Sequence, residues 1–169
     1  MKTRYWILTL MLIISLALPL QASLADEPTA GLPASAAETE FASERQQAIA
    51  ALQAQNPGAV VDYAVRERDD GRYEWDLFFT LNGQIGECEV CEEDFKVLRT
   101  VLYDLPEGGL KASEAMDALA RQKGDITIID LELDREGGGI RYEGEASLNE
   151  KRYEFEIRVT GDIIEWERD

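Results

Sequence analysis

The sequence predicts an α+β fold of two tandem units packed together, each a helix followed by an antiparallel meander of strands. The first observation is that the spacing of apolar residues changes from about 3.6 to about 2 residues, and that this change occurs twice. The second is that the tripeptide Ala-Ser-Glu opens both segments, at residue 42 and at residue 112. Each unit alone would bury too little apolar surface for a stable domain, so we expect the two to share a core.

The first unit is expected to span residues 41–91 and to begin with a helix. Ser43 is a favourable N-cap residue, and Ala48, Ile49 and Leu52 fall on one helical face. An Asn-Pro-Gly sequence then ends the helix, and three strands with polar turns follow. The side chains expected to face inward from the first two strands are Val61, Tyr63, Val65, Tyr73, Trp75, Leu77, Phe79 and Leu81.

Residues 92–111 are expected to connect the units through a helix over 92–104 and a loop. The sequence Pro-Glu-Gly-Gly after this segment should stop the helix. The apolar residues at helical spacing are Phe95, Leu98, Val101 and Leu102.

The second unit, residues 112–169, repeats the order of the first. Ser113 is its expected N-cap, and Met116 and Leu119 lie on the apolar face of its helix. Alternation then predicts three strands and a short fourth strand at 163–166. The expected inward side chains of the three strands are Ile129, Leu131, Leu133, Tyr142, Gly144, Ala146, Leu148, Tyr153, Phe155, Ile157 and Val159.

This second unit resembles a PepSY domain. The matching segments are the Ala-rich opening helix ASEAMDALARQ, the strand IIDLELD, the Tyr-Glu strand RYEGEAS and the closing sequence RYEFEIRVTGDIIEWE. Residues 42–90 look like a more divergent copy. The chain departs from the family where Val159-Thr160 replaces the usual acidic residue before the final turn glycine. The resemblance implies an exported, non-enzymatic module that binds or regulates a protein such as a peptidase, and it carries over no catalytic residue.

Residues 1–25 are typical of an export signal. Lys2 and Arg4 precede the apolar run Ile7–Leu18, and small residues stand before the expected cleavage site. Residues 26–40 are rich in Ala, Pro, Thr, Ser and Glu, so we expect a flexible linker. Because the apolar run is too short to cross a bilayer, we expect a periplasmic or secreted protein without a stable membrane anchor after cleavage.

The charged residues exclude several classes of function. The chain has 17 Lys and Arg against 34 Asp and Glu, a net charge of −17, and it has no His. Ser-His-Asp and Cys-His catalysis therefore cannot be assembled within it. Its negative charge repels phosphate, so nucleic acid is not an expected partner. We expect no enzymatic activity, no cofactor and no metal; a hydrolase using two carboxylates is an alternative, but nothing selects the pair.

The pair Cys88-Glu-Val-Cys91 can be a redox site, part of a metal site or a local disulfide. Neighbouring acidic residues disfavour a thiolate, and a zinc site would need two further ligands. In an oxidising compartment we expect a structural disulfide. Because residues i and i+3 of a flat strand point to opposite faces, this bond requires the chain to turn before Cys91. A thiol–disulfide or metal-handling protein is the alternative function.

A set of acidic residues is expected on the outward face of the second unit, opposed by Arg141, Arg152 and Arg158. Such a face can steer a basic protein partner, or it can serve only solubility. Phe78 also points outward by strand parity, either as an interface anchor or as a contact with the other unit. The predicted binding face consists of Asp130, Glu132, Asp134, Glu143, Glu145, Glu154 and Glu156, together with Phe78.

The alternating acids from Asp130 to Glu136 also suggest a calcium-binding loop. The EF-hand loop requires Gly at its sixth position and Glu at its twelfth, where this chain has Arg135 and Arg141. The exposed face of a strand therefore explains this pattern better. The sequence predicts an exported regulator or inhibitor that binds a protein partner with a basic surface, and it leaves the oligomeric state open.

Overall fold

The computed structural model describes residues 36–69 and 71–169 of the chain. The predicted export signal, residues 1–25, and most of the predicted linker lie outside these residues. Within the described part, no helix has both the length and the apolar character needed to cross a membrane.

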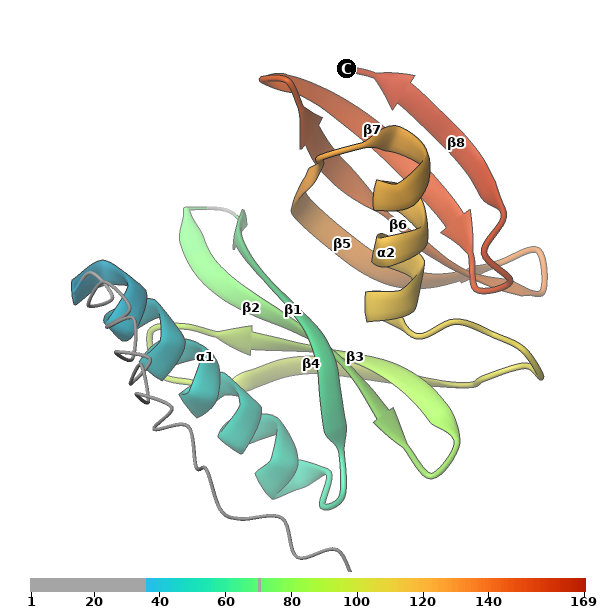
Figure 1. Cartoon of the computed structure of the whole chain (residues 1–169). Helices are drawn as coiled ribbons and strands as arrows, with labels where there is room; N and C mark the ends of the chain where they lie inside the picture. Colours follow the sequence, from blue (N-terminus) through green and yellow to red (C-terminus); the bar gives the residue numbers. More distant parts are fainter. Residues whose placement is uncertain (1–35, 70) are drawn as a thin grey trace, which may run out of the picture. The chain divides into compact units, whose positions relative to one another are not determined.

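The described chain is an α+β fold in which the order of one helix and four strands occurs twice (Figure 1). Each set of four strands forms an antiparallel sheet in which sequence neighbours pair, so both sheets are simple meanders. The first half comprises α1 (Ala36–Gln55), β1 (Val60–Asp69), β2 (Arg72–Leu81), β3 (Gln84–Cys91) and β4 (Val97–Asp104). The second half comprises α2 (Ala112–Lys123), β5 (Thr127–Glu136), β6 (Gly139–Leu148), β7 (Lys151–Arg158) and β8 (Ile163–Arg168).

The predicted starts of both helices are wrong: α1 begins several residues earlier than expected, and α2 has a different N-cap residue. Helix α1 begins at Ala36, so residues 36–40 belong to it rather than to a linker, and Ser43 lies inside the helix. Helix α2 takes Lys111 as its N-cap, and the Glu114 side chain accepts a hydrogen bond from the Lys111 N–H. Ser113 is therefore not the N-cap, and it contacts Asp62 of β1 instead.

The predicted connecting helix over 92–104 is also wrong, because most of this segment forms β4. The strand pairs with β3 and places Val97 and Leu102 on the α1 side and Tyr103 on the opposite side. Apolar residues are therefore needed on both faces, which hides the alternation that marks a half-buried strand. The extra residue Leu98 forms a bulge, which shifts the spacing further.

The core between α1 and the first sheet follows the predicted pattern in the middle of β2, but Tyr73, which was predicted to face inward, is 44% exposed. Trp75, Leu77 and Phe79 are buried there, and Trp75 is only 1% exposed. They pack against the α1 residues Ala48 and Leu52, which the helical spacing predicted to face inward. The middle of β2 is thus buried under α1.

The opposite face of the first sheet belongs to a second core, shared with α2 and the second sheet. A register shift between Val61 and Tyr63 turns Tyr63 and Val65 away from α1, against the predicted parity. Phe78 is 1% exposed and packs between Tyr63 and Tyr142, with ring centroids 6.4 and 6.3 Å away. Its predicted role on an exposed binding face is therefore wrong, and its alternative, a contact with the other unit, is correct.

Two carboxylates join the halves by hydrogen bonds. Asp62 accepts bonds from the Ser113 N–H at 3.0 Å and from the Ser113 hydroxyl at 2.9 Å. Glu87 of β3, only 2% exposed, accepts a 2.7 Å bond from the Leu133 N–H of β5. Two of these three bonds satisfy backbone N–H donors of the second half.

The second sheet buries seven of the eleven inward residues that alternation predicted, and the other four are partly exposed. The buried set comprises Leu131, Leu133, Tyr142, Ala146, Phe155, Ile157 and Val159. The prediction of Ile129 as an inward residue is wrong, because a register shift between Ile128 and Asp130 places Ile128 against this core instead. At Gly144 any Cβ would lie 2.2 Å from the carbonyl oxygen of Asp130, so only glycine fits beside this irregularity.

Candidate functional site

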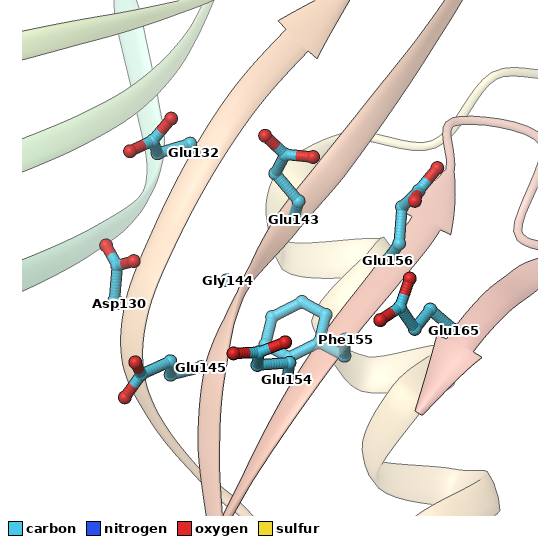
Figure 2. A pocket seen from close by; sticks show the side chains of 9 residues that line it. All are labelled: Asp130, Glu132, Glu143, Gly144, Glu145, Glu154, Phe155, Glu156 and Glu165. Carbon is cyan, nitrogen blue, oxygen red and sulfur yellow. The ribbon is translucent and has the colours of Figure 1, made fainter. Parts of the chain in front are cut away.

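The outward face of the second sheet carries a groove whose rim is almost wholly acidic. The groove encloses about 340 Å³. Figure 2 shows carboxylates from all four strands β5–β8 around it. Its lining residues are Asp130, Glu132, Glu143, Gly144, Glu145, Glu154, Phe155, Glu156 and Glu165.

The cross-strand register explains why these acids gather. Glu132 pairs with Glu143, Glu143 with Glu156, and Glu156 with Glu165, so four glutamates form one row across the sheet. A second row contains Asp130, Glu145, Glu154 and Glu167, one step along the strands. Like charges placed directly opposite each other destabilise a sheet, so this arrangement is not one that serves the stability of the fold.

Two arginines balance part of this charge. Arg141 lies 3.1 Å from the Glu143 carboxylate and 3.0 Å from that of Glu156, and it also pairs with Asp134 at 3.0 Å. Arg152 pairs with Glu145 at 3.0 Å. Within residues 36–69 and 71–169, no ion pair forms at the remaining carboxylates of the groove, which are Asp130, Glu132, Glu154 and Glu165.

The surroundings of two groove acids favour their neutral forms. Partial burial, followed by the charge of Asp130, raises the pKa of Glu132. Partial burial also raises the pKa of Glu143, although Arg141 counteracts this effect. A bound cationic group would relieve the repulsion that these carboxylates exert on one another.

Six of the seven predicted acidic residues line the groove, whereas Asp134 lies outside its lining and pairs with Arg141. Glu165 is a groove residue that was not singled out from the sequence. The signal for it was present, because an inward Trp166 in a strand at 163–166 requires its neighbour to face outward.

The predicted disulfide is not formed, because Cys88 and Cys91 are free and buried. Strand β3 continues through Cys91 without the turn that a disulfide requires, so the two thiols lie on opposite faces. Cys88 belongs to the core beneath α1. Burial raises the pKa of the Cys88 thiol, although Thr100 donates a hydrogen bond to its Sγ at 3.5 Å. A buried thiol with a raised pKa is a poor redox nucleophile.

The comparisons with known proteins find solved structures of low similarity to this chain. No protein-family model matches it, and no curated protein matches its sequence. A candidate lipoprotein from Clostridium difficile 630 is 12% identical, with 74% of this chain and 92% of that chain covered and a TM-score of 0.41. A DUF2874 family protein from Bacteroides uniformis is 16% identical, covering 72% and 87% of the two chains, with a TM-score of 0.31. The C-terminal domain of Bacillus megaterium YpeB is 13% identical, covering 76% and 64%, with a TM-score of 0.36.

These identities assign neither a family nor an activity. The PepSY resemblance of residues 112–169 stays a prediction, and so does the interpretation of the two halves as tandem PepSY-like units. The function is therefore argued from the chain's own groove.

Proposed function

We propose that the chain is an exported, non-enzymatic binding module that holds a Lys- or Arg-rich segment of a protein partner in the acidic groove of the second sheet. The observation that carries the proposal is the row of glutamates from β5 to β8, only partly neutralised by Arg141. In this role the chain regulates or inhibits its partner by occupying a basic surface, and it catalyses no reaction.

The geometry supports a cationic ligand in preference to a neutral one. Carboxylates accept charge-assisted hydrogen bonds from guanidinium and ammonium groups, and guanidinium binds a carboxylate through two parallel bonds. Groove acids without ion pairs, such as Glu154 and Glu165, can form such bonds without first breaking an internal one. The net charge of −17 also attracts a basic partner from a distance and speeds association.

A labelled peptide rich in Arg and Lys tests the proposal through fluorescence anisotropy with the full chain. Binding should weaken several-fold between about 50 and 300 mM NaCl, because salt screens exposed charges over roughly 6–14 Å in this range. The double variant Glu154→Gln/Glu165→Gln should weaken binding by about three- to tenfold, since it removes two exposed charge-assisted contacts.

The matched control is Glu107→Gln/Asp117→Asn, which changes the net charge equally at exposed positions in a loop and on α2. It should leave the affinity within about twofold of the original chain. Equal losses in both double variants would show that only total charge matters, and the groove would then not be the binding site.

A further inference from the structure

Three carboxylates from three different strands meet away from the row of glutamates. They belong to Glu67 of β1, Asp76 of β2 and Asp130 of β5, and one oxygen from each lies within 4.8 Å of the others. Their sequence positions are far apart, and the register shifts in β1 and β5 contribute to bringing them together. The cluster therefore bridges the two sheets of the fold.

The buried state of Asp76 is the second, independent observation. Its side chain is 3% exposed, and its Oδ2 is buried without a hydrogen-bond partner. The Oδ1 of Asp130 is also buried and without a partner. A buried carboxylate oxygen without a donor costs free energy, so such groups in proteins are normally paired with a donor or a metal ion.

The charged groups around Asp76 make this cost larger. Burial, followed by the charges of Glu67, Glu87 and Asp130, and then Glu89, raises the pKa of Asp76 to about 9. The nearest arginine of the β3–β4 pair, Arg99, is engaged by Glu89 at 2.7 Å and lies 3.8 Å from Glu87. Within residues 36–69 and 71–169 no ion pair forms at Asp76, so a bound cation would supply the positive charge that this carboxylate lacks there.

We propose that Glu67, Asp76 and Asp130 form a binding site for a Ca²⁺ ion that links the first sheet to the second. Ca²⁺ binds carboxylate oxygens at about 2.3–2.6 Å, so oxygens on opposite sides of one ion lie roughly 4.6–5.2 Å apart. The spread of the three ligand oxygens fits within this limit. This site shares Asp130 with the sequence run 130–136 but takes its other two ligands from the first sheet, so it does not depend on the EF-hand spacing, which fails.

The first test is thermal unfolding of the full chain at pH 7.5 with about 5 mM CaCl₂ or with EGTA. Ca²⁺ should raise Tm by several degrees and bind with a Kd of about 10⁻⁴ M, within the range of weak calcium modules. Asp76→Asn should abolish the calcium-dependent part of this shift. Glu132→Gln, a groove carboxylate outside the cluster, should retain it and is the matched control for charge.

Calorimetric titration with CaCl₂ gives a second measurement that needs no variant. Binding should be saturable, with one Ca²⁺ bound per chain. No saturable binding up to about 5 mM, or a Tm shift that Asp76→Asn retains, would overturn the proposal. Binding of a basic peptide to the groove is measured separately, so the outcomes of the two proposals are distinguishable.

Discussion

The buried carboxylate of Glu87 should make the stability of the fold depend on pH. Burial raises its pKa to about 7, although the Leu133 N–H counteracts the effect, whereas the ordinary value is 4.5. Because the pKa is higher in the folded chain, the unfolded chain loses this proton first as the pH rises above 4.5. The stabilising contribution of protonated Glu87 to the free energy of unfolding is therefore fully present below pH 4.5 and is lost as the pH rises through 7. At about 1.4 kcal/mol for each pH unit, the loss amounts to about 3 kcal/mol.

Glu87→Gln isolates this effect, because glutamine stays neutral and its side-chain oxygen can still accept the bond from Leu133. Urea unfolding followed by circular dichroism should show equal stability of the two chains near pH 4.5 and a gain of about 3 kcal/mol for the variant near pH 9. Glu93→Gln, at an exposed position, controls for the lost charge. A gain that is the same at both pH values would refute the assigned cause.

Three further outcomes follow from the packing and the cysteines. Phe78→Ala should lower the free energy of unfolding in urea by about 3–5 kcal/mol, because it leaves a cavity in the core shared by the two halves. Gly144→Ala should cost about 1–3 kcal/mol or more, since its new Cβ meets the carbonyl of Asp130 at 2.2 Å. Without reductant, Ellman's reagent should titrate both Cys88 and Cys91 after denaturation and should react slowly with the native chain, because both thiols are buried.

Each of these outcomes has a control within the chain. Leu98→Ala removes an apolar side chain that is already 47% exposed, so it should cost far less than Phe78→Ala. Gly139→Ala places its Cβ 3.8 Å from the nearest atom and should be nearly neutral. If the denatured chain showed no free thiols until reductant was added, the predicted disulfide between Cys88 and Cys91 would be correct after all.

The sequence predicted the α+β class and most of the buried residues because alternation is strong wherever one face of a strand is exposed. It failed for Val97–Asp104, because both faces of β4 meet apolar neighbours. The apolar residues of this segment therefore fit the spacing of a helix as well as that of a strand. It also failed at Tyr63 and Phe78. The register shift in β1 reverses the side on which Tyr63 packs, and alternation cannot show that a second core covers the face of β2 that carries Phe78.

The acidic groove was largely predictable, because outward positions of a meander follow directly from period-two alternation. The cluster of Glu67, Asp76 and Asp130 was not. Its members come from three strands and two sheets, and Asp76 occupies a position that parity assigns to the solvent. Only the packing of one sheet against the other buries Asp76, and no pattern within a single strand reports that packing.

Strand β5 is the outermost strand of its sheet, and such strands are where a foreign chain can add itself through open amide groups. At Leu133 that opportunity is closed, because the amide is already bonded to the carboxylate of Glu87. The acid that weakens the fold at alkaline pH thus also satisfies a buried amide on this strand. Glu87→Ala would leave the Leu133 amide buried without its carboxylate acceptor, and an unsatisfied buried donor costs free energy.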